Sequence, residues 1–252
     1  MTMRLLILGG TTEASTLAQA VADRGLNAVF SYAGRVHTPR SQPIPHRVGG
    51  FGGVAGLAGY LRDHNISHVI DATHPFAAQM SWNAFHACQQ TMTPLIALTR
   101  PPWQAQAGDN WQNVADIDGA VAALQGPAQR IMLALGRLHM NAFAAQAQHH
   151  YVLRLVDAPS TPPALPNHQV IVARGPFETA GDIALFQDHK IDLIVCKNAG
   201  GQGAEAKIHA ARALGLPILM INRPDLPPRK AVATAEEIFD WLDHQPATDR
   251  GV

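Results

Sequence analysis

Short apolar runs alternate with amphipathic segments along the whole chain, and this rhythm restricts the possible folds more than any other feature. Residues 4–8, which are apolar after Arg4, form a compact β-type run that ends at Gly9-Gly10. Residues 12–24 then place apolar side chains at i, i+3, i+4 and i+7, which is the pattern of an amphipathic helix. Strands that alternate with helices are typical of parallel sheets covered on both faces. The sequence therefore predicts an α/β fold.

The rhythm occurs in two successive sets, which predicts two doubly wound, Rossmann-like lobes with parallel sheets and a cleft between them. Strands are expected at residues 4–8, 27–32, 68–72, 94–98, 130–135, 151–156, 169–173, 192–196 and 217–221. Helices are expected at residues 12–24, 54–64, 80–90, 116–124, 138–147, 178–188, 204–214 and 234–244. Thr234 and Glu237 have the spacing of a capping box. Gly126-Pro127 breaks the pattern, so we expect domains at residues 1–125 and 126–252.

Composition narrows the class of protein. Apolar residues make up 47% of the chain and charged residues 15%, which supplies a core and argues against disorder. Lys plus Arg equals Asp plus Glu at 19 each, without the basic excess of a nucleic-acid binder. Cys88 and Cys196 lie far apart, so neither a disulfide framework nor a metal site is expected. Because no apolar stretch reaches spanning length, we expect a cytoplasmic protein without a membrane partner.

The first glycine turn has the form of a nucleotide-binding site. A strand, Gly9-Gly10 and a helix start follow one another, so backbone amides and the helix dipole would favour a phosphate. The turn departs from the G-x-G-x-x-G fingerprint, because Thr11 replaces the second glycine and Ala14 the third. An ordinary strand-to-helix turn is the alternative. The predicted cofactor contacts are Gly9, Gly10, Thr11, Thr12 and Glu13.

The end of the second expected strand favours NADPH over NADH. An NAD-type site places a carboxylate there to bond the ribose 2′-hydroxyl, whereas this chain reads Ser31-Tyr32-Ala33-Gly34-Arg35. Arginine can bind phosphate through two parallel hydrogen bonds. Ser31 and Arg35 are therefore predicted to hold the 2′-phosphate of NADPH, and Gly34 is a further predicted cofactor contact. The alternative is that Arg35 is a solvated loop residue.

Two further loops of the first half are candidates for contact with the cofactor. Gly52 and Gly53 belong to a run of four glycines around a phenylalanine, where backbone could approach a ligand; a flexible turn without function is the alternative. Thr73 and His74 follow a buried strand, at the place where ligands of doubly wound sheets bind. Thr73 is a predicted cofactor contact. His74 is the candidate catalytic residue, which would orient a reactant or relay a proton, unless it only caps the loop before Pro75.

The second half supplies candidate anion-binding groups. Residues 197–204 form a Gly-rich turn without the Lys-Ser/Thr pair of a Walker A loop, which disfavours an ATPase. Cations and amides at the ends of strands would suit a substrate with several carboxylates. Each cation taken alone is also typical of solvated surface charge. The predicted substrate contacts are Arg137, Arg174, Lys197, Asn198, Gly200, Gly201 and Lys207.

Together these motifs resemble the precorrin-6A reductase family of cobalamin biosynthesis. The most specific strings are Asp71-Ala72-Thr73-His74-Pro75-Phe76-Ala77 and Lys197-Asn198-Ala199-Gly200-Gly201. Residues 8–14, 48–53, 100–103 and 174–177 are also similar to the family pattern, so the resemblance covers roughly residues 4–224. It implies an NADPH-dependent oxidoreductase that acts on a CH-CH group. Such an enzyme transfers a hydride to the tetrapyrrole macrocycle of precorrin-6A and forms precorrin-6B.

Three alternatives to this function stay open. The chain could be another NADPH-dependent reductase of a C=N bond that shares only the cofactor-binding lobe. It could also act on the cobalt-containing form of the precorrin. The third alternative is a nucleotide-sensing module that binds NADPH without turnover of any tetrapyrrole.

Overall fold

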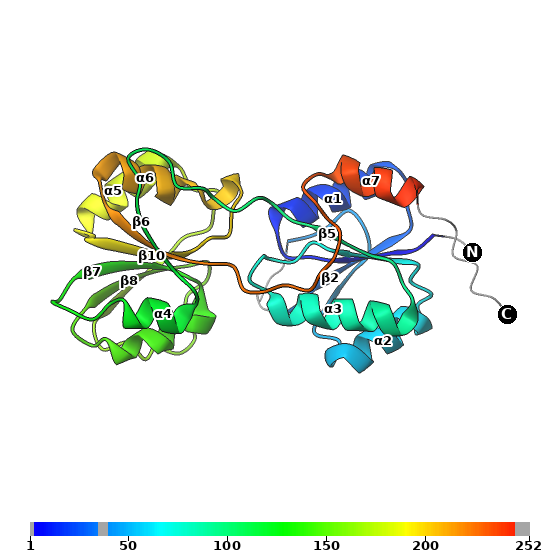
Figure 1. The fold of residues 1–252 in the computed structure, drawn as a ribbon, viewed down its shortest axis with the longest axis horizontal. Helices are drawn as coiled ribbons and strands as arrows, with labels where there is room; N and C mark the ends of the chain where they lie inside the picture. Colours follow the sequence, from blue (N-terminus) through cyan, green and yellow to red (C-terminus); the bar gives the residue numbers. More distant parts are fainter. Residues whose placement is uncertain (1–2, 35–39, 245–252) are drawn as a thin grey trace. The chain divides into compact units, whose positions relative to one another are not determined.

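The computed structural model describes residues 3–34 and 40–244, and it divides the chain into two compact units. The first unit comprises Met1–Pro101 and Asp225–Val252, and the second comprises Pro102–Pro224. Each unit is built on its own six-stranded parallel sheet (Figure 1). The predicted α/β fold with two parallel sheets is therefore confirmed. In the part of the chain that is described, no helix is both long and apolar enough to cross a bilayer.

The sheet of the first unit has the strand order β12-β5-β4-β1-β2-β3. Its strands are β1 (Leu5–Leu8), β2 (Ala28–Tyr32), β3 (His46–Val48), β4 (His68–Asp71), β5 (Leu95–Leu98) and β12 (Ala231–Val232). Strands β1, β2 and β4 are buried along their whole length. Burial on both faces explains why these strands have nearly continuous apolar sequences rather than alternating ones.

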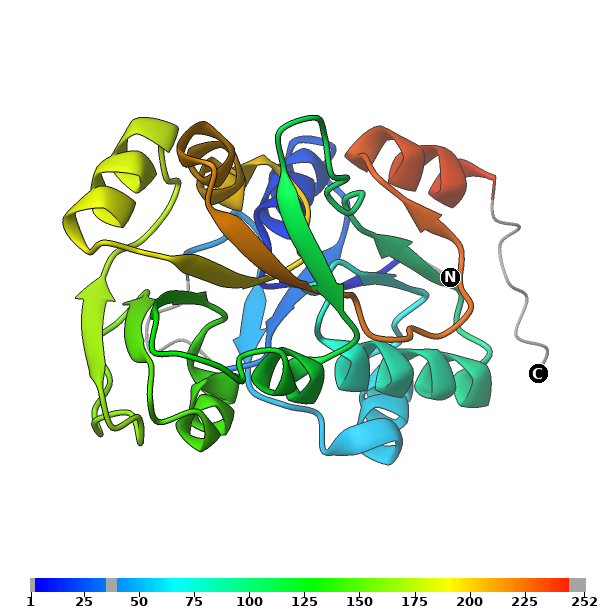
Figure 2. The ribbon, with the colours of Figure 1, turned by 60° about the vertical axis from the view of Figure 1, so that its left-hand side comes forward.

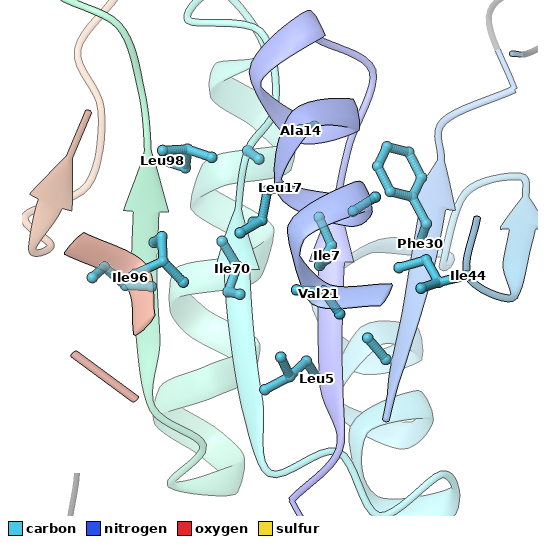
Figure 3. Packing of buried hydrophobic residues seen from close by; sticks show 14 of the residues in the cluster. Leu5, Ile7, Ala14, Leu17, Val21, Phe30, Ile44, Ile70, Ile96 and Leu98 are labelled. Carbon is cyan, nitrogen blue, oxygen red and sulfur yellow. The ribbon is translucent and has the colours of Figure 1, made fainter. Parts of the chain in front are cut away.

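Helices cover both faces of this sheet. Helices α1 (Thr12–Asp23) and α7 (Ala235–Asp243) lie on one face, and α2 (Gly53–Asp63) and α3 (Ala78–Thr91) lie on the other (Figure 1). Successive residues of a strand point to opposite faces. Leu5 and Ile7 of β1 accordingly pack in the core that contains α1 and α7 (Figure 3), whereas Leu6 and Leu8 pack with α2 and α3.

The sheet of the second unit has the strand order β6-β11-β10-β7-β8-β9. Its strands are β6 (Asn110–Val114), β7 (Arg130–Ala134), β8 (His150–Leu155), β9 (His168–Val172), β10 (Leu193–Lys197) and β11 (Pro217–Ile221). Its helices are α4 (Ile117–Ala122), α5 (Thr179–Asp188) and α6 (Ala206–Leu214), with 3₁₀ helices η1 (Arg137–Ala145) and η2 (Gln202–Ala204). Phe186 of α5 and Ile208 of α6 pack on Met132, Ile194 and Ile218 of the sheet.

Both sheets take one edge strand from a distant part of the chain. β6 precedes the other strands of its unit and pairs with β11, while β12 belongs to the returning C-terminal segment and pairs with β5 (Figure 2). The expected domain boundary near Gly126 is therefore corrected: the chain changes units after Pro101 and again after Pro224. The physical reason is that β6 completes the second sheet, whereas α7 packs into the core of the first.

The remaining elements differ from the sequence prediction in only a few places. The predicted capping box of Thr234 and Glu237 is confirmed at the start of α7. Residues 137–145 form a 3₁₀ helix, although an α-helix is expected there. The buried side chains of that helix, Met140 and Phe143, are three residues apart, which matches the repeat of a 3₁₀ helix. Strands β3, β6 and β12 are not expected from the sequence, because they are short or largely polar.

Candidate active site

The strand order of the first sheet reverses between β1 and β4, and ligands of such sheets bind beyond the carboxyl ends of the strands at this point. Leu8 and Asp71, the last residues of the two strands, are register partners. The Thr11 hydroxyl donates to the Ala72 carbonyl at 3.0 Å and accepts from the Ala14 amide at 3.1 Å. Thr11 therefore joins the turn after β1 to the turn after β4 and also caps α1.

The two glycines after β1 are needed for different reasons. A Cβ on Gly9 would lie 2.0 Å from the Phe30 ring, so packing excludes a larger residue. Gly10 is exposed, has φ of +125°, and would present a Cβ to open space. Gly10 thus leaves bare backbone at the N-terminus of α1, which a phosphate group can approach closely. Thr12, another predicted cofactor contact, is also exposed, in the first turn of α1.

Glu13 is paired with Arg100. The Arg100 Nη1 and the Glu13 Oε2 are 2.6 Å apart, and Glu13 lies in the first turn of α1. A carboxylate at a helix N-terminus is favoured by the helix dipole, and the guanidinium adds positive charge beside the turn where phosphates are expected. The pairing joins residues 87 positions apart in the sequence, so no local pattern predicts it.

The carboxyl ends of β2 and β3 bring Ser31, Gly34 and Arg47 close to one another. Arg47 Nη1 donates to the Ser31 hydroxyl oxygen at 2.8 Å. A Cβ on Gly34 would lie 3.6 Å from the Gly49 backbone, so the two turns touch. Arg35, the predicted phosphate contact, lies outside the described residues. Arg47 is not among the residues expected from the sequence, although a basic residue two positions before a Gly-rich loop is a signal that could have identified it.

That Gly-rich loop opens α2 at the same edge of the sheet. The Gly49 amide donates to the Tyr32 carbonyl at 2.9 Å, which places the start of the loop beside the end of β2. Gly52 and Gly53 are exposed, and a Cβ on either would meet nothing within 4 Å. The backbone of both predicted contacts is therefore accessible to a ligand.

Asp71 forms a buried polar cluster at the end of β4. Its Oδ1 accepts from the Thr73 amide at 3.2 Å and from the Thr73 hydroxyl at 2.6 Å. Its Oδ2 accepts from the Ser81 hydroxyl at 2.7 Å and lies 3.0 Å from Arg229 Nη2. The Asp71 and Arg229 side chains are only 1% and 9% exposed. This cluster fixes Thr73, a predicted cofactor contact, to the end of the strand.

His74 is exposed in the loop between β4 and α3. Its Nδ1 accepts from the Phe76 amide at 3.2 Å, and its carbonyl accepts from the Ala77 amide at 2.7 Å. These bonds give His74 a local capping role. Because Nδ1 acts as an acceptor, the neutral ring carries its proton on Nε2.

The second unit has an equivalent edge between β7 and β10, where its strand order reverses. The Asn198 side chain binds the backbone of Trp103, accepting from its amide at 2.8 Å and donating to its carbonyl at 3.0 Å. The Trp103 indole donates to the Gly201 carbonyl at 3.1 Å. Lys207 is buried, donates to the Ala204 carbonyl and lies 4.5 Å from the Trp103 ring centroid. The polar groups of Asn198 and Lys207 thus organise the loop around Trp103.

The other predicted substrate contacts of this unit differ in exposure. Arg137 follows the turn after β7 and is exposed. Arg174 is exposed and lies 3.3 Å from Asp157. Lys197 ends β10 half-buried. Gly200 is buried and Gly201 half-buried, and their φ angles are +69° and +75°. A residue not expected from the sequence also contributes here, because Arg223 donates to the carbonyls of residues 198 and 199 at 3.0 Å each.

Neither cysteine suits a catalytic nucleophile. Burial raises the pKa of the Cys88 thiol to about 12, and the nearby Asp71 charge adds to this effect. Burial also raises the pKa of the Cys196 thiol. A raised pKa removes the thiolate form that reacts. Among the described residues, no group of three or more His, Cys, Asp or Glu side chains is placed to hold a metal ion.

Known proteins match this chain over nearly its whole length. Residues 4–243 match the family described as precorrin-6x reductase CbiJ/CobK. The precorrin-6A reductase of Rhodobacter capsulatus is 57% identical over 249 residues, which is 99% of each chain. The cobalt-precorrin-6A reductase of Priestia megaterium is 28% identical over 96% of this chain and 98% of its own. A solved structure described as CobK precorrin-6A reductase superposes with a TM-score of 0.94 at 57% identity, covering 100% of both chains. The chain therefore belongs to the precorrin-6x reductase family.

Proposed function

We propose that this protein uses NADPH to reduce precorrin-6A to precorrin-6B, by hydride transfer to the macrocycle, during corrin-ring synthesis. The observation that carries the proposal is the 57% identity over 99% of both chains to the precorrin-6A reductase of Rhodobacter capsulatus. The first unit supports the cofactor half of the proposal. Its strand-order reversal offers exposed backbone at Gly10, and a guanidinium rather than a carboxylate borders the end of β2.

The residues proposed to hold NADPH lie at the carboxyl edge of the first sheet, apart from Arg35, whose position is outside the described residues. The pyrophosphate would bind at the N-terminus of α1, the 2′-phosphate at the ends of β2 and β3, and the nicotinamide by Thr73 and His74. When bound, NADPH supplies the hydride. The proposed contacts are Gly9, Gly10, Thr11, Thr12, Glu13, Ser31, Gly34, Arg35, Gly52, Gly53 and Thr73.

The protein's own contribution is to bind and orient the two reactants. Thr11 and the Asp71 cluster hold the two turns together, so that Thr73 has a fixed position. The His74 Nε2–H is a hydrogen-bond donor at an exposed position, where it can orient the substrate. The proton that accompanies hydride transfer can come from water or from the protonated, imidazolium form of His74.

The second unit is proposed to bind the carboxylates of the tetrapyrrole. Arg137, Arg174 and Lys197 offer cations for this role, and the amides of Gly200 and Gly201 offer further donors. Asn198 and Lys207 are proposed to act through Trp103, which they hold in place.

Two titrations test the proposal. NADPH and then NADH are titrated into the purified protein with fluorescence detection, and precorrin-6A is then added. The expected result is tighter binding of NADPH and loss of its fluorescence on addition of precorrin-6A. Cobalt-precorrin-6A is assayed in parallel, because the Priestia megaterium relative is named for that substrate. Binding of NADPH without oxidation by either precorrin would contradict the proposed substrate.

A further inference from the structure

Ser31 and Arg47 lie next to each other at the carboxyl edge of the first sheet. They are register partners on β2 and β3, and Ser31 is also the register partner of Leu8 on β1. A glycine follows each of the three residues within three positions. Arg47 therefore belongs to the row of strand ends that borders the first glycine turn, which is where a dinucleotide binds in a doubly wound sheet.

Several contacts hold the Arg47 guanidinium at this edge. Nη1 donates to the Ser31 hydroxyl oxygen and to the Gly49 carbonyl, both at 2.8 Å, and Nη2 donates to the Gly50 carbonyl at 3.0 Å. The guanidinium carbon also lies 4.0 Å from the centroid of the Phe51 ring. A cation over an aromatic face is attracted to it. The positive charge is thus positioned at the strand end instead of extending freely into solvent.

The guanidinium retains donors for a ligand. An arginine side chain has five N–H donors, and three of those of Arg47 are used in the bonds just described. No described residue accepts from its Nε–H or from the second hydrogen on Nη2. Residues 28–34 and 46–53 contain no Asp or Glu that would neutralise the charge locally. Two donors on one cation match the geometry with which arginine binds phosphate.

We infer that Arg47 binds a phosphomonoester on the ribose of the nucleotide, which is the 2′-phosphate that distinguishes NADPH from NADH. The inference rests on the proposed function, because it requires a dinucleotide at the first glycine turn. Ser31 is only 5% exposed and accepts from Arg47, so beside its proposed contact with the cofactor it positions the guanidinium. Arg47 is then the residue that determines cofactor specificity at the end of β3.

Equilibrium binding of 2′,5′-ADP and 5′-AMP to the full chain tests this inference. Arg47→Met should weaken binding of 2′,5′-ADP by about 10- to 100-fold, as expected for lost hydrogen bonds to a charged group. Binding of 5′-AMP should change by less than about twofold. Arg47→Lys keeps the charge and should recover part of the affinity for 2′,5′-ADP. Arg62→Met is the matched control, because Arg62 is an exposed arginine in the last turn of α2, and it should change neither affinity.

The possible failures are distinguishable. If Arg47→Met and Arg47→Lys weaken the binding of 2′,5′-ADP and of 5′-AMP equally, then Arg47 only stabilises the Gly-rich turn. That result would overturn the inference. If Arg47→Met keeps the wild-type preference for 2′,5′-ADP, another group binds the 2′-phosphate. That result would overturn the assignment of Arg47 but not the proposed preference for NADPH. A wild-type protein that binds both ligands equally would overturn the proposed NADPH preference itself. Arg47→Lys provides the comparison if Arg47→Met does not fold.

Discussion

Replacement of Arg229 by methionine should strongly destabilise the first unit. Arg229 belongs to the C-terminal segment that returns from the second unit, and its guanidinium lies 3.0 Å from Asp71 Oδ2. The Asp71 side chain is 1% exposed, so water cannot replace the lost cation without local opening of the structure. Methionine preserves much of the apolar stem of arginine, and the change therefore removes mainly the charge and its hydrogen bonds.

The magnitude follows from what surrounds Asp71. Breaking a buried ion pair by removing one partner costs about 3–5 kcal/mol. Asp71 would keep its bonds from the Thr73 amide, the Thr73 hydroxyl and the Ser81 hydroxyl, so we expect a loss near the lower limit, about 3 kcal/mol. Arg174→Met is the matched control. Its pair with Asp157 is 59% and 31% exposed, and its loss should cost less than about 1 kcal/mol.

Urea denaturation followed by circular dichroism measures both free energies of unfolding. The double variant Asp71→Asn/Arg229→Met removes the buried negative charge as well, and it should be more stable than Arg229→Met by at least about 1 kcal/mol. Asp71→Asn alone completes the comparison. The reasoning is refuted if the effects of Asp71→Asn and Arg229→Met simply add in the double variant, or if Arg229→Met costs no more than Arg174→Met.

Three further predictions concern packing, protonation and loop order. Gly9→Ala should cost about 1–3 kcal/mol in urea denaturation, because its Cβ would lie 2.0 Å from the Phe30 ring, and adding Phe30→Leu should recover part of that loss; an unrelieved loss would contradict the packing argument. Burial lowers the pKa of His68 from 6.5, so its contribution to stability is complete above about pH 6.5 and declines as the pH falls towards the lowered pKa. His68→Gln should flatten this part of the stability–pH curve, and an unchanged curve would argue against the burial effect. Asn198→Ala removes two hydrogen bonds to the Trp103 backbone, of 2.8 and 3.0 Å, and should cost about 1–2 kcal/mol with a red shift of tryptophan emission; a wild-type spectrum and stability would refute this role.

Most elements of the fold can be predicted from the sequence because apolar periodicity is a local signal. The strand expected at residues 4–8 is observed as Leu5–Leu8, and the helix expected at 12–24 as Thr12–Asp23. The boundary between units depends instead on which strands pair. β6 joins β11 more than a hundred positions further along the chain, and no pattern near Gly126 reveals this pairing.

The candidate site likewise has features that the sequence predicts and features that it does not. Glycine turns at strand ends can be recognised locally, and the structure places Gly10 and Thr73 at the edge where the strand order reverses. The partners of polar side chains depend on tertiary structure. The pairing of Asp71 with Arg229 and the binding of Trp103 by Asn198 join distant segments, so residue type and spacing alone do not predict them.

Isotope transfer tests the central claim most directly. The protein is incubated without oxygen with precorrin-6A and NADPH that carries deuterium at the transferable position, and the tetrapyrrole is analysed by mass spectrometry. The account predicts one deuterium in the reduced macrocycle for each NADPH oxidised. Recovery of unchanged precorrin-6A while NADPH remains bound and unoxidised would contradict it.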